Sequence, residues 1–398
     1  LHADGLSLEP FFTASRNSDE ACVVWREFAS RWHLFAGTAS SYWLSTTWRT
    51  QFGLTSELNA DNADEYYDRI AQALATPEFR PAALFNRFNI EVLATTDSPL
   101  DSLDAHRAIK ESGHLTGRVL PTFRPDAFTD PEHPDFIANL EALAATTNRN
   151  AADAHGYLES LRDRRQFFIQ HGAVSADHGV AEATTMNLDK EEFAAIYADA
   201  LSGNLDRQGA RIFRAAMLVE MAKMSADDGL VMTIHPGVFR NHSSSTFAKH
   251  GPDTGHDIPV AVEYTHNLRP LLEEVGLRPT FKLVLFSIDE TVYSREIAPL
   301  AGFYPSVYIG APWWFLDAPD AARRAREAIT ETAGFSRGSG FIDDTRAFLS
   351  IPARHDMARR TDAGFLARLV AEGRLSEPEA SRIIIDSSYH QPKRVFNL

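Results

Sequence analysis

Short apolar runs alternate along the chain with longer stretches in which apolar residues recur at helical spacing. The runs are almost continuously apolar, which is typical of parallel strands covered on both faces. In chain order they are Ile90–Thr95, Arg118–Phe123, Ala173–Ser175, Leu230–Ile234, Lys282–Ile288, Ser306–Gly310 and Gly340–Ile342. Strands that alternate with helices predict an α/β fold in which helical crossovers join parallel strands.

Boundary signals mark the helices between these runs. Asp206 can cap a helix, and Gly229 would end that helix directly before the run Leu230–Ile234. A second helix is expected to begin at residues 317–319 and to end at Gly334. Each helix therefore leads into a strand, as a crossover helix does.

Residues 1–85 contain aromatic helical segments and no strand pattern, so we predict a helical subdomain at 1–85 and a barrel domain at 86–398. Parallel strands with crossovers fit either an open doubly wound sheet or a (β/α)8 TIM barrel whose first strand is absent. The chain starts at Leu1 without a methionine. We favour the barrel, with strand one upstream and the helical subdomain inserted after it.

Composition and charge exclude several classes of function. The chain has 39 Lys and Arg against 54 Asp and Glu, a net charge of −15, which would repel nucleic acids and anionic membranes. Its apolar runs are shorter than the roughly 20 residues of a membrane span. Cys22 is the single cysteine, so an internal disulfide cannot form and a cytoplasmic location is predicted.

Polar residues follow most of the predicted strands. In a barrel these carboxyl ends form the reactive face. The ends carry Thr95-Thr96-Asp97, Arg124-Pro125-Asp126, Asp177-His178, His235-Pro236-Gly237, Trp313-Trp314 and Asp343-Asp344-Thr345-Arg346. Several of these residues also have an ordinary structural interpretation. Asp126 could be a turn or helix-cap residue, His235 a structural histidine, and Asp343-Asp344 a solvated pair.

Two arginines at the same barrel mouth indicate an anionic ligand. Arg124 and Arg346 would be costly to bury unless a carboxylate or phosphate paired with them. No GxGxxG follows a strand and no GxxxxGK[ST] occurs in the sequence, which argues against a nucleotide phosphate. A small molecule with a carboxylate is the favoured ligand.

Five segments, in this order and spacing, resemble one known family. They are residues 92–103, 119–126, 235–241, 313–315 and 344–348. They are similar to uronate isomerase, also called glucuronate isomerase, a divergent branch of the amidohydrolase superfamily. The resemblance covers essentially the whole chain and implies a (β/α)8 barrel.

The resemblance implies an aldose–ketose isomerase that interconverts D-glucuronate with D-fructuronate and D-galacturonate with D-tagaturonate. Asp344 looks like the family's metal-ligating carboxylate, and His235 is similar to its catalytic histidine. Arg124, Arg346 and Trp313 look like its substrate-binding residues. The implied cofactor is a divalent metal, and zinc is expected with His and Asp ligands.

The chain also departs from the family pattern. The family has a His-x-His metal pair and a His-Tyr pair, but no His-x-His occurs in residues 1–398 and no His-Tyr occurs at a predicted strand end. We therefore expect that strand one carries them outside this chain, and that the chain as it stands holds metal poorly. A metal-dependent hydrolase of a carboxylated lactone or amide, and an inactive barrel used for binding, stay as alternatives. The aromatic helical subdomain suggests a homo-oligomer.

Overall fold

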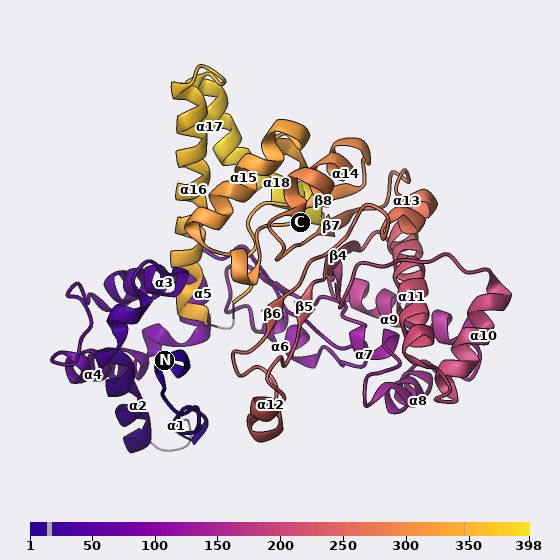
Figure 1. Cartoon of the computed structure of the whole chain (residues 1–398), viewed down its shortest axis with the longest axis horizontal. Coiled ribbons are helices and arrows are strands. Elements are labelled where there is room, and N and C mark those ends of the chain that lie inside the picture. Colours follow the sequence, from indigo (N-terminus) through magenta and orange to yellow (C-terminus); the bar gives the residue numbers. More distant parts are fainter. Residues whose placement is uncertain (14–17, 346) are drawn as a thin grey trace.

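Six parallel strands form the centre of the computed structural model, which describes residues 1–13, 18–345 and 347–398 (Figure 1). The strands are β1 (Val92–Ala94), β2 (Arg118–Leu120), β3 (Ser175–Gly179), β4 (Val231–His235), β7 (Leu283–Leu285) and β8 (Val307–Ile309). β1 pairs with β2, and β3, β4, β7 and β8 pair in that order. A bridge between Phe123 and Ala176 connects the two groups.

The strand order distinguishes between the two predicted architectures. A doubly wound sheet reverses its strand order at a switch point. Here each of the six strands lies beside the next one along the chain, and the order does not reverse. This is the winding of a barrel, as the sequence predicts. The short strands β5 (Val238–Phe239) and β6 (Ile258–Pro259) form a separate antiparallel pair.

The predicted strand Gly340–Ile342 is wrong. In the described residues the pairing in this region is a single bridge between Gly338 and Ile309, next to which the Ser339 amide donates to the Ile309 carbonyl at 2.8 Å. Gly340 has φ of +80°, outside the extended region, so the strand conformation cannot continue through it.

The predicted run Ala173–Ser175 is displaced. The strand begins at Ser175 and continues to Gly179, so Asp177 and His178 lie within β3 and not after it. Their side chains consequently point to opposite faces of the sheet.

Helices connect the strands, and most of them pack around the parallel strands, whereas one short helix lies at the far end of the β5–β6 pair (Figure 1). They are α6 (Asp104–Ser112), α7 (Asp126–Thr129), α8 (Phe136–Thr147), α9 (Ala154–Gln170), α10 (Lys190–Leu201), α11 (Arg207–Asp228), α12 (Ser244–His250), α13 (Arg269–Val275), η6 (Tyr293–Ile297), α14 (Ala298–Phe303), η7 (Trp314–Leu316) and α15 (Pro319–Ala333). The Asp206 carboxylate accepts from the Gly209 amide at 2.7 Å, and Gly229 ends α11 at φ +81°. Both predicted limits of this helix are confirmed.

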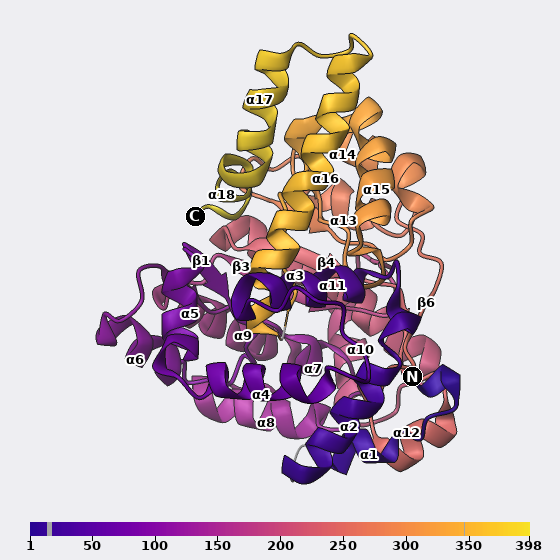
Figure 2. The ribbon, with the colours of Figure 1, turned by 90° about the vertical axis from the view of Figure 1, so that its left-hand side faces the viewer.

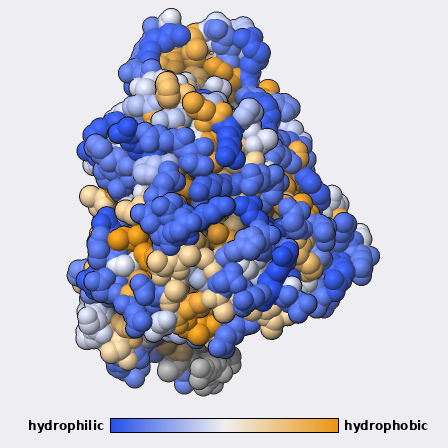
Figure 3. All heavy atoms as spheres, turned by 90° about the vertical axis from the view of Figure 1, so that its right-hand side faces the viewer, coloured by the Kyte–Doolittle hydropathy of each residue, from blue (hydrophilic) through white to orange (hydrophobic). Residues whose placement is uncertain are grey.

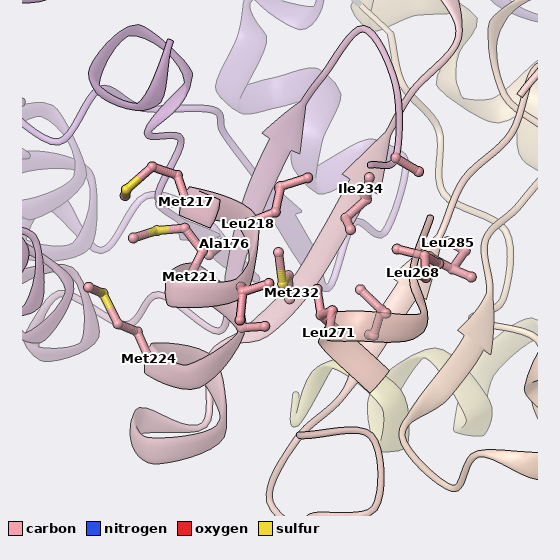
Figure 4. Close-up of a cluster of buried hydrophobic side chains, with 14 of the residues drawn as sticks. Ala176, Met217, Leu218, Met221, Met224, Met232, Ile234, Leu268, Leu271 and Leu285 are labelled. Atoms are coloured by element: carbon pink, nitrogen blue, oxygen red, sulfur yellow. The ribbon is translucent and has the colours of Figure 1, made fainter. Parts of the chain in front are cut away.

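The main hydrophobic core lies between the strands and these helices. Met217, Met221 and Met224 on α11 belong to it, together with Met232 and Ile234 on β4 (Figure 4). Because side chains alternate along a strand, the other residues of β4, namely Val231, Thr233 and His235, face the barrel interior. β4 thus presents one face to a helix and the other to the site described below.

A second apolar cluster fills the barrel interior. It joins Val231 of β4 and Val284 of β7 to Val395 and Phe396 of the last helix, α18 (Gln391–Phe396). Lys282, directly before β7, donates from Nζ to the Arg394 carbonyl at 2.5 Å. The C-terminal helix therefore closes the amino end of the barrel.

The regular elements that the structure describes before β1 are helices. They are η1 (His2–Asp4), α1 (Glu9–Thr13), α2 (Ser18–Ser30), η3 (Trp32–Phe35), α3 (Ala39–Thr47), η4 (Trp48–Phe52), α4 (Ala63–Leu74), η5 (Pro77–Phe79) and α5 (Pro81–Arg87). Trp32, Trp48, Phe52 and Tyr66 form a core of their own there. The division into subdomains at residue 85 stays a prediction.

The elements after α15 are η8 (Phe335–Arg337), η9 (Phe348–Ser350), α16 (Ile351–Ala371), α17 (Glu377–Ile385), η10 (Asp386–His390) and α18. Helices α16 and α17 form a pair that projects away from the barrel, and the lower end of α16 reaches the N-terminal helices (Figure 2). Hydrophilic residues cover most of the face in Figure 3. None of the helices in the described residues has the length and apolar character needed to cross a bilayer.

Candidate active site

The carboxyl ends of β3 and β4 bring a carboxylate and a histidine together. Asp177 on β3 is paired in register with Thr233 on β4, two residues before His235. The Thr233 hydroxyl donates to Asp177 Oδ1 at 2.6 Å, and His235 Nδ1 lies 2.7 Å from the same oxygen. The histidine contact has the distance of an ion pair, although its angle is not that of a well-aligned hydrogen bond. Asp177 thereby holds the Nδ1 edge of the His235 ring toward β3.

Aromatic rings hold the other faces of His235. The ring of Phe286 stacks on the imidazole with centroids 4.2 Å apart and planes 9° apart. Trp313 meets it edge-on, with centroids 4.8 Å apart. The His235 side chain keeps 18% of its surface exposed, so the imidazole is oriented and still accessible.

Arg124 follows β2 and lies between two carboxylates. Its Nε donates to Asp126 Oδ2 at 2.7 Å, and its Nη1 lies 3.4 Å from Asp177 Oδ2. Burial by itself would lower the pKa of Arg124, but the nearby carboxylates of Asp126, Asp177 and Asp344 raise it, so the guanidinium stays charged. With 36% of its side chain exposed, it has N–H groups available to a ligand.

The two carboxylates beside Arg124 respond differently to this environment. Burial raises the pKa of Asp126 to about 6, and Arg124 only partly opposes that effect. Burial also acts to raise the pKa of Asp177, but His235 and Arg124 together hold it well below its usual range. Asp177 is therefore ionised at neutral pH, and its two oxygens face the Arg124 guanidinium and the His235 ring.

Gly179 permits this close packing. A Cβ at this position would lie 2.5 Å from Arg124 Nη2 and 2.8 Å from Asp126 Oδ2. The Gly179 amide instead donates to Asp126 at 3.1 Å. The sequence interpretation of Asp126 as a cap or turn residue missed this role, because the partner is 53 residues away.

Trp313 and Asp344 complete the arrangement. The Trp313 Nε1 donates to Asp344 Oδ2 at 2.8 Å, which connects the segment after β8 to the segment after Gly340. Trp314, by contrast, is 37% exposed and stacks on Phe315. Of the paired tryptophans, the one chosen from the sequence is therefore the one that faces His235.

The structure thus brings together four of the five residues predicted for the site: Arg124, His235, Trp313 and Asp344. The fifth, Arg346, lies outside the described residues. Asp177 was missed as the central contact because the strand was expected to end at Ser175. Asp177 is two residues from Ser175 and two from Gly179, so the three share one face of an extended strand. This spacing was the signal that could have identified Asp177.

The described residues do not by themselves make a metal site. Asp344 is predicted as a ligand, but no group of three or more His, Cys, Asp or Glu side chains with suitable geometry occurs among residues 1–13, 18–345 and 347–398. A structural or catalytic zinc needs three or four protein ligands.

Comparisons with known proteins agree with this architecture. A family model described as glucuronate isomerase matches residues 8–396. The chain is 49% identical over 399 residues to the uronate isomerase of Corynebacterium efficiens, an alignment that covers 100% of this chain and 85% of that protein. It is 51% identical over 401 residues to the uronate isomerase of Phenylobacterium zucineum, covering 100% of this chain and 83% of that protein.

The chain belongs to the uronate isomerase family. Among solved structures, glucuronate isomerase from Caulobacter crescentus superposes with a TM-score of 0.91 at 51% identity, covering 94% of this chain and 78% of that one. Uronate isomerase from Thermotoga maritima superposes with a TM-score of 0.92 at 28% identity, covering 98% and 85%.

Membership of the uronate isomerase family confirms three predictions from the sequence: the family, the α/β barrel fold class, and activity as an isomerase. A metal-dependent hydrolase from Lactobacillus casei, described as putative, has a TM-score of 0.56 at 14% identity, covering 94% of this chain and 90% of that one. That likeness concerns the fold alone, so the hydrolase alternative gains no support from it.

Proposed function

We propose that the chain's isomerase reaction takes place at the carboxyl ends of β2, β3 and β4, on D-glucuronate and D-galacturonate, giving D-fructuronate and D-tagaturonate. The observation that carries this assignment is the continuous set of contacts from Arg124 through Asp177, His235 and Trp313 to Asp344. These residues place three groups in one small region: the Arg124 cation, which can bind the substrate's carboxylate, the accessible His235 imidazole and the Asp344 carboxylate.

The reaction explains why these residue types are needed. Moving a proton from C2 to C1 of the open-chain sugar passes through an enediolate, which requires a base and stabilisation of the developing negative charge. His235 is held by Asp177 and two aromatic rings, which is the geometry expected of a proton-transfer group. We assign it that role.

The carboxylate of the substrate is assigned to Arg124. Its guanidinium uses Nε and Nη1 for Asp126 and Asp177, which leaves N–H groups of Nη1 and Nη2 for a ligand. A carboxylate clamped at C6 fixes the distance of C1 and C2 from the remaining site residues, so binding energy away from the reacting carbons positions them. Arg346 is proposed as a second clamp.

Asp344 is proposed to act in opening the sugar ring and as a ligand of a divalent metal, with zinc as the expected ion. When bound, such a metal would supply charge stabilisation of the oxyanion. Asp344 is the ligand that we propose among the described residues, and the remaining ligands would come from outside them. A small-molecule substrate, a cytoplasmic location and a homo-oligomeric state complete the proposal.

The test is an assay of the natural full-length protein with each uronate, with ketose formation followed by NMR, before and after treatment with a chelator. Asp344→Asn is compared with Asp320→Asn, a control in which the carboxylate lies on α15 and is 77% exposed. We expect turnover by the wild type and by the control, and a loss of at least about 100-fold in Asp344→Asn. Wild-type protein without uronate turnover contradicts the proposed substrates.

A further inference from the structure

A buried arginine on α16 contacts two chain segments that carry residues of the candidate active site. Arg354, in the first turn of α16, is 6% exposed. A buried guanidinium is costly unless its N–H groups are paired, so its partners indicate what it was placed there to hold.

Its first partner belongs to the segment of Trp313. Arg354 Nε donates to Asp317 Oδ2 at 3.0 Å, and its Nη2 donates to the same oxygen. Asp317 is 4% exposed and follows η7, whose turn includes a hydrogen bond from the Leu316 amide to the Trp313 carbonyl at 3.0 Å. Fixing Asp317 therefore fixes the turn that carries the Trp313 indole.

Its other partners belong to the segment of Asp344. Arg354 Nη1 donates to the Asp344 carbonyl at 2.9 Å and lies 2.5 Å from Asp343 Oδ1. Within the described residues the Asp343 carboxylate has no well-aligned hydrogen bond, and its ion pair with Arg354 supplies a cation to this buried group. The guanidinium thus holds the main chain from which the Asp344 side chain points.

The fourth contact anchors the arginine to the N-terminal helices. The Arg354 guanidinium lies 4.8 Å from the ring centroid of Trp43 on α3. The Trp43 indole also donates to Met357 Sδ at 3.3 Å, one turn further along α16. An aromatic ring therefore holds one face of the Arg354 guanidinium, while the edge of the guanidinium contacts the two site segments, residues 313–317 and 343–344.

We propose that Arg354 is a positioning residue for the isomerase reaction, a role that rests on the function proposed above. It holds the turn after β8 and the segment Asp343–Asp344 together, so that the Trp313 indole meets the Asp344 carboxylate. A guanidinium suits this task because its planar N–H fork binds several acceptors in fixed directions, whereas a lysine presents one point charge.

The test compares Arg354→Lys with Arg326→Lys in the natural full-length protein. Arg326 is the matched control: it lies on α15 and binds Asp362 on α16 through two hydrogen bonds of 2.8 Å each, so it too is an arginine that ties α16 to its surroundings, but its side-chain hydrogen bonds in the described residues go to Asp362 and not to residues 313–317 or 343–344. Asp317→Asn is the second variant, since it weakens the same clamp from the other side. Far-ultraviolet circular dichroism checks that each variant is folded.

We expect Arg354→Lys and Asp317→Asn to lower kcat about 10-fold to 100-fold, the range seen when a residue that orients a functional group is changed, with KM within about threefold. Arg326→Lys should keep kcat within about twofold even if its melting temperature falls. Equal losses of kcat in Arg354→Lys and Arg326→Lys, or no loss in the folded Arg354→Lys, would overturn the role of Arg354.

A readout without substrate separates this role from the proposed function. Trp313→Phe should change the near-ultraviolet circular dichroism of the wild type, and should change it much less in the Arg354→Lys background, where the indole has lost its fixed orientation. An equal change in both backgrounds would overturn the positioning role. If the wild type turns over neither uronate, the proposed substrates fail, and this spectral comparison still decides the role of Arg354.

Discussion

The two ends of strand β4 lie four residues apart and pack against different surroundings. Val231 at the amino end is fully buried in an apolar cluster that includes Phe396 of the C-terminal helix. His235 at the carboxyl end is partly exposed and meets a carboxylate and two aromatic rings. The amino end of the barrel is built for stability and the carboxyl end for chemistry, a division typical of this fold.

Among variants that test this difference between the two ends, His235→Asn is expected to have the largest effect, a loss of kcat. Loss of a positioned proton-transfer group should lower kcat by about 100-fold to 10,000-fold with little change in unfolding free energy, because the imidazole lies at the open end. Steady-state kinetics and urea denaturation measure the two quantities.

His178 provides the control for that variant. It is one residue from Asp177 on β3, is 2% exposed, and points away from the site, where its Nδ1 lies 3.0 Å from the Thr233 carbonyl. Burial lowers its pKa to about 4, so it is neutral at neutral pH. His178→Asn should reduce stability and leave kcat within a few fold. A kcat loss as large as that of His235→Asn would show that the two faces of the sheet are not functionally distinct.

The next largest effect concerns the closed end. Phe396→Ala should lower the free energy of unfolding by about 3 kcal/mol, because it leaves a cavity among residues that cannot collapse fully. kcat should stay unchanged at temperatures where the variant is folded. Phe303→Ala, which removes a phenyl ring that is 72% exposed, should cost less than about 0.5 kcal/mol. A Phe396→Ala variant that is stable but inactive would mean that the amino end controls the chemistry.

A smaller effect is expected from Trp313→Phe. It keeps an aromatic ring beside His235 and removes the hydrogen bond to the Asp344 carboxylate, a type of bond that contributes about 1.5 kcal/mol. kcat/KM should therefore fall about tenfold. Trp314→Phe, at the exposed neighbour, should change it less than about threefold. The reverse order of the two variants would contradict the assignment of Trp313 to the site.

The smallest effect should be a pH dependence from Asp126. Its pKa is raised to about 6 in the folded state, so the folded protein binds more protons than the unfolded chain between about pH 4 and pH 6. Stability contributed by this group is then present at low pH and falls as pH rises through that window. Because 30% of the side chain is exposed, we expect about 1 kcal/mol, below the roughly 3 kcal/mol that two pKa units set as an upper bound.

Denaturation of wild type and Asp126→Asn at pH 4.5 and pH 7 measures this difference. The wild type should lose stability over that interval relative to the variant. A wild type that gains stability relative to Asp126→Asn would show that Arg124, and not burial, dominates at this carboxylate.

Much of the fold could be predicted because its signals are local. Five strands, β1, β2, β4, β7 and β8, were located from apolar runs, and the helix from Asp206 to Gly229 was delimited by a side-chain cap and a left-handed glycine. The segment at Gly340 failed because its apolar residues look like a strand while its backbone turns at the glycine. The strand predicted at Ala173–Ser175 was placed a few residues too early, because the polar side chains inside β3 were interpreted as lying after the strand.

Much of the candidate site could also be predicted, because polar residues after strands stand out against apolar runs. What escaped was the partner of each predicted residue. Asp177 contacts His235 on the next strand, and Arg354 contacts Asp317 across 37 residues. Pairs this far apart leave no periodic signal, since neither residue alters the local pattern of the other.

The sequence by itself determined the alternation of strands and helices, the polar residues at the strand ends and, through its motifs, the resemblance to the family to which the chain belongs; the strand order of the structure then distinguished the barrel from an open sheet. The sequence did so because strand period, helix caps and motif order are properties of neighbouring residues. Only the tertiary structure decided that Asp177 joins Arg124 to His235, and that Arg354 holds Trp313 against Asp344. Those contacts depend on strand register and on which face of each strand turns inward, and a shift of one residue would reverse both.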